Sequence, residues 1–226
     1  MGDSTESRAA ESPKKDPLRR LIEAARAKER EDLIPLVSDA EPAAPGRWTA
    51  KDNLAHLSSW RLLGVAELDA IRTGEPAPPV SDDVDEHNAG VYEATRDLPA
   101  DEVIAAASES WDELAEALDA CSEEDLLLPR LRHPDSPAWQ LVAGHTYFHV
   151  GDHLGTVLTE QGHEDAAERL AYWAHGQATG AFPEDRRRGV ADYNLACFYA
   201  KNGRAAEALP YLASAFRLLP SLRELA

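Results

Sequence analysis

Three histidines in the second half of the chain have the spacing with which a helix presents ligands to a metal ion. His145, His149 and His153 follow one another at intervals of four residues within AWQLVAGHTYFHVGDHLGTVLT, residues 138–159. On an α-helix each such step passes a full turn by only about 40°, so the three imidazoles would form one stripe. Two histidines at positions i and i+4 are a known source of two metal ligands. A complete site needs a third ligand from elsewhere in the chain.

His56 is the candidate for that third ligand. It lies in a predicted helix that begins at Thr49 and stops at Gly74. Three neutral imidazoles leave a fourth position on a metal open to water or substrate, which distinguishes catalytic zinc from closed structural sites. The cation would lower the pKa of the bound water or bind a substrate thiolate. The alternative interpretation is that these histidines are satisfied polar groups lining a helical bundle.

The hydrophobic pattern predicts an all-α protein, because no stretch alternates with period two as a β-strand does. Four substantial helices with a long crossover up to about residue 162 predict a four-helix bundle, in which metal sites are built from inward side chains of facing helices. Residues 1–15 are predicted to be a disordered tail and 16–162 the bundle. The helical segments expected in the bundle are 16–37, 49–73, 84–96, 100–121 and 138–159.

Residues 163–226 are predicted to form a helical extension. A helix is expected over 163–180, and residues 189–222 are similar to one tetratricopeptide repeat, a helix–turn–helix unit of about 34 residues. One repeat cannot bury its own apolar face, so we expect it to stack on the preceding helix and the bundle. The usual tryptophan of the first helix is replaced by Asp192 and Tyr193. The matching positions are Leu195, Ala196, Tyr199, Gly203, Ala208, Leu212, Ala215 and Pro220.

Charge and composition restrict the class of partner. The 226 residues carry a formal charge of −18, so nucleic acid and anionic membranes would repel the protein. Small molecules, metals and proteins remain as partners, and both a monomer and a homodimer stay open. Two distant cysteines, Cys121 and Cys197, and the absence of a signal-peptide or membrane-spanning pattern predict a cytoplasmic location.

Several other residues carry specific expectations. We expect Cys121 and Cys197 to be small buried side chains and the charged run KEREDL (28–33) to be a solvated face. Trp60, one turn after His56, is expected either to form a wall of the pocket or to pack in the core. Asp52 and Asp152 are candidates to orient ligand imidazoles, as carboxylates often do, although a solvent-facing cap is the simpler role for Asp52.

Residues 16–160 resemble the DinB-like superfamily. The family's first motif, a tryptophan, a Lys-Asp pair and a leucine before the first histidine ligand, is matched by Trp48, Lys51, Asp52, Leu54 and His56. Its second motif, HxxxH followed by a glycine, is matched by His149, His153 and Gly155. The frequent arginine and glutamine beside that glycine are replaced here by Leu154 and Thr156. Residues 85–103 are similar to the branch with ClbS/DfsB-type proteins and mycothiol-dependent maleylpyruvate isomerase-like domains.

The resemblance implies a DinB-like four-helix bundle in which His56, His149 and His153 bind a divalent metal. His145, one turn away, is expected to pack or to contact groups around the ligands, and the alternative is that it replaces one of them as a ligand. Zinc is the expected ion, with nickel, manganese and iron as alternatives. The implied activity is thiol transfer to, or hydrolysis of, small electrophilic molecules in detoxification or stress, with a low-molecular-weight thiol as cosubstrate. Two other functions stay open. One is a scaffold that binds a protein partner through the tetratricopeptide-like unit, and the other is sequestration of a drug or toxin without turnover.

Overall fold

The computed structural model describes residues 15–39, 47–76, 79 and 83–224, and within these ranges the secondary structure is helical, with no β-strand. This confirms the all-α prediction. The predicted tail lies outside the described residues, except for Lys15. No helix in the described part of the chain is long and apolar enough to cross a membrane. The α-helices are α1 (Lys15–Lys28), α2 (Ala50–Thr73), α3 (Val84–Thr95), α4 (Ala100–Ala120), α5 (Trp139–Ala143), α6 (His149–Glu160), α7 (Glu164–Ala181), α8 (Asp185–Lys201) and α9 (Ala205–Leu218).

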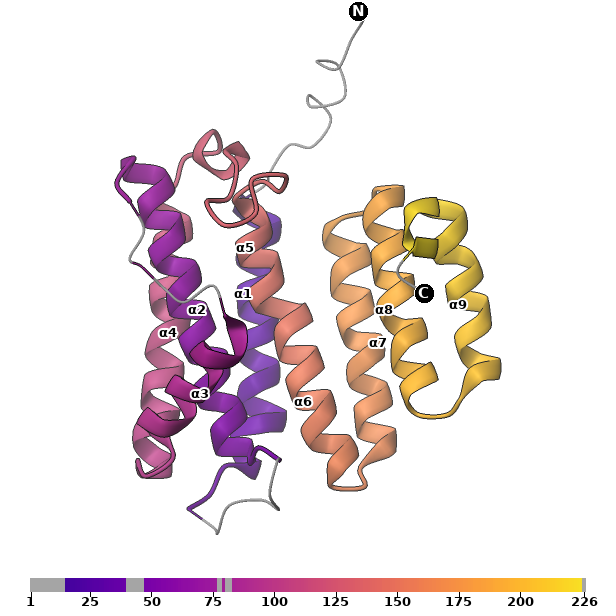
Figure 1. The fold of residues 1–226 in the computed structure, drawn as a ribbon, viewed down its shortest axis with the longest axis horizontal. Coiled ribbons are helices and arrows are strands. Elements are labelled where there is room, and N and C mark those ends of the chain that lie inside the picture. Colours follow the sequence, from indigo (N-terminus) through magenta and orange to yellow (C-terminus); the bar gives the residue numbers. More distant parts are fainter. Residues whose placement is uncertain (1–14, 40–46, 77–78, 80–82, 225–226) are drawn as a thin grey trace, which may run out of the picture.

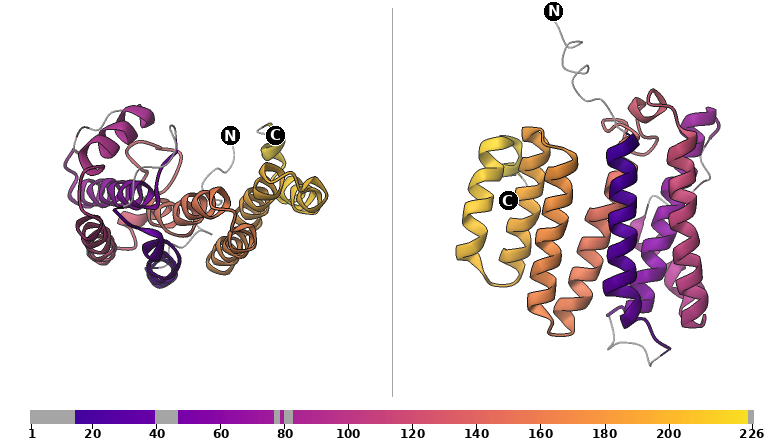
Figure 2. Two further views of the ribbon diagram at one scale, coloured as in Figure 1. Left: turned by 90° about the horizontal axis from the view of Figure 1, so that it is seen from below. Right: turned by 180° about the vertical axis from the view of Figure 1, so that it is seen from behind.

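Four helical segments pack side by side as a bundle, and the remaining helices flank it. The bundle consists of α1, α2, α4 and the consecutive α5 and α6 (Figure 1). α3 lies against α2, while α6 packs along α7 at the other edge of the bundle. Figure 2 shows α7, α8 and α9 continuing outward from α6 with roughly parallel axes. Because α2 also contacts α6, residues far apart in the sequence meet inside the bundle.

α2 begins and ends where the sequence predicts. The Thr49 hydroxyl accepts a hydrogen bond from the backbone N–H of Asp52 (3.1 Å), and the Asp52 carboxylate accepts one from the backbone N–H of Thr49 (2.8 Å). This reciprocal capping box satisfies two of the donors that a helix start leaves free. Gly74 ends the helix with a φ of 75°, which glycine adopts without steric strain. The expectation of a solvent-facing Asp52 was wrong, because the residue is only 7% exposed.

A charged pair lies in the middle of the apolar core. The side chains of Arg61 on α2 and Glu29 are 0% and 2% exposed, and Nη1 lies 2.8 Å from Oε2. Arg61 Nε also donates to Ser110 Oγ (2.9 Å), and Trp111 Nε1 donates to Glu29 Oε1 (2.8 Å). The expectation that residues 28–33 form a solvated face was therefore wrong at Glu29. Its burial is tolerated because the opposite charge and the hydrogen bonds replace lost hydration.

The histidine-bearing segment is not the single regular helix that we expected over 138–159. A π-helical turn, Gly144–Phe148, separates α5 from α6, and Thr146 within it has non-helical backbone angles (φ −99°, ψ −110°). π-Helical turns are often found at functional sites. The turn removes His145 from the regular stripe, whereas His149 and His153 keep their helical spacing within α6.

Beyond α6 the described part of the chain forms three further α-helices, α7, α8 and α9. α8 and α9 make a hairpin that turns at Gly203 (φ 71°), with a small core of Leu195, Ala196, Tyr199 and Ala208. This hairpin overlaps residues 189–222, which match the tetratricopeptide pattern, but begins four residues earlier, and its assignment to that repeat stays a prediction. The Tyr199 hydroxyl donates to Glu168 on α7 (2.7 Å), and Arg204 forms an ion pair with the same carboxylate (2.7 Å). These bonds attach the hairpin to α7.

The expectations for the two cysteines are met at one position. Cys121 at the end of α4 is buried, and burial raises the pKa of its thiol. Cys197 on α8 is only half-buried and lines a cavity, so the expectation of a buried side chain was wrong there.

We predict that replacing Glu29 with glutamine destabilises the protein by about 3–5 kcal/mol, because the buried guanidinium of Arg61 loses its compensating charge. Unfolding in urea, followed by circular dichroism, measures the difference. The matched control is Glu31→Gln, two residues away and exposed, which we expect to change stability by less than about 0.5 kcal/mol. Equal effects at both positions would contradict a structural role for the pair.

Candidate metal centre

The structure brings His56 of α2 together with His149 and His153 of α6. The Nε2 atoms of His56 and His149 are 3.0 Å apart, and one nitrogen from each of the three rings lies within 4.8 Å of the others. Tetrahedral zinc with bonds of about 2.0–2.1 Å would hold its nitrogens about 3.3 Å apart. Small ring movements therefore suffice to place one ion among them. Across the described ranges, no other group of three His, Cys, Asp or Glu side chains has this geometry.

Asn53 orients one of the three rings. Its Oδ1 lies 2.8 Å from Nδ1 of His153, so Nδ1 is the protonated donor and Nε2 keeps its lone pair for a cation. Asn53 Nδ2 donates in turn to the carbonyl of Thr49 (2.9 Å), which fixes which end of the amide faces the imidazole. Asn53 thus performs the role that carboxylates often have beside metal-bound histidines.

The sequence did not single out Asn53. Its position three residues before His56 was the available signal, since that spacing places both side chains on one face of α2. The carboxylates considered for this role lie elsewhere. Asp52 caps α2, and Asp152 is exposed at the edge of the cleft.

Aromatic side chains enclose the three histidines in a cleft of about 410 Å³. The ring of Trp48 lies 4.9 Å from that of His56, and the ring of Trp60 lies 6.0 Å from it on another side. Trp60 Nε1 donates to Asn88 Oδ1 on α3 (3.1 Å), which holds the indole in place. Phe148 completes this aromatic wall. Of the two roles considered for Trp60, the structure shows the pocket wall.

Burial keeps the three imidazoles neutral. Burial, and then the neighbouring His153 and His87, lower the pKa of His56 to about 3. The pKa of His149 falls to about 2, again through burial first and then through the other histidines. Burial also lowers the pKa of His153. At pH 7 the nitrogens therefore carry lone pairs instead of protons, as metal ligands must.

His145 does not join the three rings that converge. It packs against Gly64 of α2, where an added Cβ would come within 2.8 Å of its Cδ2 atom. Its ring stacks on Trp60 at 6.5 Å and lies 5.8 Å from that of His149. Burial, together with the charge of Arg130, lowers the pKa of His145 to about 3. It is a neutral imidazole lining the cleft beside the three candidate ligands.

The donor set fits a divalent transition metal. Imidazole nitrogen suits zinc, nickel and iron, and the three rings come from two packed helices. Nδ1 of His56 and of His149 are buried without a hydrogen-bond partner in the part of the chain described. Only one proton can lie between the two facing Nε2 atoms, whereas a cation would use both lone pairs at once.

One comparison with known proteins gives a match. The family model described as the DinB superfamily matches residues 10–157, which include all three histidines and Asn53. α7, α8 and α9 lie beyond the matched residues. No curated protein and no solved structure matches the chain.

The lowered pKa values predict that the metal-free protein loses stability as the pH falls from 7 to 5. The unfolded chain binds protons to its histidines near pH 6.5, while folded His56 and His149 take them up only near pH 3 and pH 2. Each of these histidines changes the free energy of unfolding by at most about 1.4 kcal/mol per pH unit. Urea unfolding at several pH values measures this dependence.

The matched variants are His149→Gln and His133→Gln. We expect the first to flatten the pH dependence. The second changes an exposed histidine in a loop and should leave it as in the wild type. If His149→Gln has the wild-type slope, the imidazole is not buried in its neutral form.

We predict that Asn53→Ala lowers the affinity for zinc by about 10- to 100-fold, because His153 loses the acceptor that fixes its tautomer and ring orientation. Competition with a chromophoric chelator measures the affinity. Asn194→Ala is the control, since Asn194 lines the cavity beside α7 and α8 and not the cleft of the three histidines. An Asn53→Ala protein with wild-type affinity would rule out this orienting role.

Proposed function

Because this chain belongs to the DinB superfamily, we propose that it is a metal-dependent enzyme that acts on small electrophilic molecules. In this proposal His56, His149 and His153 bind one divalent ion. The reaction is transfer of the sulfur of a low-molecular-weight thiol to the electrophile, or hydrolysis of the electrophile. The observation that carries the proposal is the convergence of three neutral imidazoles inside an aromatic cleft.

Zinc is the metal that we favour. Three histidine nitrogens with an open fourth position are the donor set of a catalytic zinc site, and neutral ligands leave the full charge of the ion available to a substrate. Nickel, manganese and iron are the alternatives. The aromatic walls favour a substrate with an apolar body, because a cleft of this size buries most of a small molecule against Trp48, Trp60 and Phe148.

A bound metal would supply Lewis acidity and lower the pKa of a water or thiol at the open position. The protein's own residues contribute positioning. Asn53 keeps the proton of His153 on Nδ1, so that Nε2 faces the centre of the cleft. The Trp60–Asn88 hydrogen bond keeps the indole against His56 and reduces the access of bulk water to that side. Burial keeps His145, beside His149, neutral.

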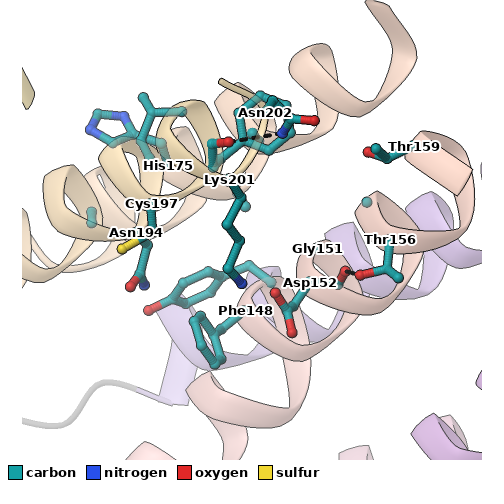
Figure 3. Close-up of a pocket in the computed structure, with 18 of the residues that line it drawn as sticks. Phe148, Gly151, Asp152, Thr156, Thr159, His175, Asn194, Cys197, Lys201 and Asn202 are labelled. Carbon is teal, nitrogen blue, oxygen red and sulfur yellow. Dashed lines mark hydrogen bonds between the residues drawn. The ribbon is translucent and has the colours of Figure 1, made fainter. Parts of the chain in front are cut away.

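A second candidate function, which we also propose for test, is protein binding through the helical extension. A cavity of about 420 Å³ lies between α6, α7 and α8, mostly beyond the residues that match the family. Figure 3 shows Lys201 extending from α8 toward Asp152 on α6, with Asn194 and Cys197 beside the cavity. An interaction module built on a tetratricopeptide-like hairpin would use this part of the molecule and would need no metal.

We predict that protein purified without a histidine tag contains about one divalent ion per chain, and that a His149→Ala, His153→Ala variant contains none. Elemental analysis by mass spectrometry gives the stoichiometry. His87→Ala is the control, because His87 packs against Trp60 and lies outside the three-histidine group. Removing the metal with a chelator should lower the melting temperature of the wild type, since bound ligand stabilises the folded state.

Two outcomes would favour other functions. If the purified protein contains no metal and neither zinc nor chelator changes its melting temperature, the enzymatic proposal is wrong. Protein binding through the helical extension is then the remaining candidate function. Metal-loaded protein that removes one equivalent of an electrophile and releases no product acts by sequestration.

A further inference from the structure

Arg130 is the only cation among the described residues that line the metal cleft. It lies in the loop between α4 and α5, and its side chain is 20% exposed. Its backbone N–H donates to the carbonyl of Ser136 (2.9 Å), and Pro129 pairs with Pro137 across the same loop. These contacts fix the backbone around Arg130, so its side chain extends from a rigid part of the loop.

The guanidinium is incompletely satisfied by the protein. It forms an ion pair with Glu67, whose Oε2 lies 3.6 Å from Nη2, beyond hydrogen-bond distance. The other oxygen of Glu67 accepts the backbone N–H groups of Leu131 (2.9 Å) and Arg132 (3.5 Å). Arg130 Nε is buried and has no hydrogen-bond partner among the residues described. A largely buried cation with a donor that lacks a partner favours an anion that can supply one.

Arg130 is also close enough to the metal centre to act on the same molecule. Arg130 and His145 line the same cleft, and the His145 ring is 5.8 Å from that of His149. The guanidinium and the three-histidine group therefore belong to one cleft of about 410 Å³. A single small molecule within it could contact both.

On the premise of the proposed metal centre, we infer that Arg130 binds a carboxylate of the substrate and so makes the cleft selective for anionic small molecules. Carboxylate matches the planar fork of a guanidinium, which can donate two parallel hydrogen bonds to it. The three neutral ligands add no negative charge to repel such a substrate. The aromatic side chains Trp48, Trp60 and Phe148 would contact the apolar segment between its two ends. Arg130 is then a specificity-determining residue that touches the substrate away from the reacting atoms.

The test uses cobalt(II)-loaded full-length protein and a set of simple probes. The probes are ω-mercaptoalkanoates of increasing chain length and their uncharged primary amides. Each thiol reports its binding through the visible spectrum of cobalt(II), so no turnover is needed. We expect one chain length to bind best, and at that length the carboxylate to bind about tenfold or more tightly than its amide.

Three variants separate the role of Arg130 from a general charge effect. In Arg130→Gln the affinities for the carboxylate probe and for its amide should differ by no more than about twofold. Arg130→Lys should retain part of the preference for the carboxylate. Arg132→Gln removes an exposed charge two residues away that does not line the cleft, and it should keep the wild-type preference. The cobalt(II) spectrum without probe and the melting temperature establish that each variant is folded.

The possible failures are distinguishable. If wild-type protein does not bind cobalt(II), the metal centre and everything built on it are wrong. If cobalt(II) binds normally but Arg130→Gln keeps the preference for carboxylates, or Arg132→Gln loses it equally, the metal centre stands and the inference about Arg130 is overturned.

Discussion

The buried ion pair between Arg61 and Glu29 sets the orientation of α2, on which the arrangement of the cleft depends. Arg61 can leave water only where Glu29, Ser110 and Trp111 surround it, and these partners come from the end of the first helical segment and from α4. This requirement fixes the rotation of α2 about its own axis. His56 lies five residues before Arg61, which places it about 140° away from Arg61 around the helix axis. His56 therefore faces α6. A polar contact in the core thereby determines which side of α2 meets the histidines of the last bundle helix.

The geometry that suits a metal is unfavourable for the metal-free fold. His56 and His149 are buried with Nδ1 atoms that lack partners in the described structure, and their pKa values are lowered to about 3 and about 2. Folding therefore removes two Nδ1 atoms from water without providing a hydrogen bond to either, and the Nε2 atoms of the two rings have only each other. Such unfavourable arrangements are characteristic of functional sites, where ligand binding supplies the missing interactions. A purely structural role would favour fully hydrogen-bonded imidazoles. In the described structure His153 bonds to Asn53, whereas His56 and His149 share a single contact between their Nε2 atoms.

Local signals made much of the fold and of the candidate site predictable from the sequence. Thr49, Asp52 and Gly74 mark the ends of α2 because capping depends on a few neighbouring residues. The i, i+4 pair in α6 was visible for the same reason. Three features depend on contacts between distant segments and were missed. Glu29 is buried only because Arg61 approaches from α2, Thr146 breaks the histidine helix within the packed segment, and Asn53 acquires its role only when α6 places His153 beside it.

α6 connects the candidate metal centre with the helical extension. Gly151 lies between the two histidines of α6 and faces α7, where a Cβ at this position would come within 3.1 Å of the Cβ of Ala174. Close packing at this point therefore holds the backbone that carries His149 and His153. α7 also contributes Ala167 and Leu170 to the same apolar core as the bundle. The family match ends within α6, but the packing continues past it, so the extension is part of the framework that positions two of the three candidate ligands.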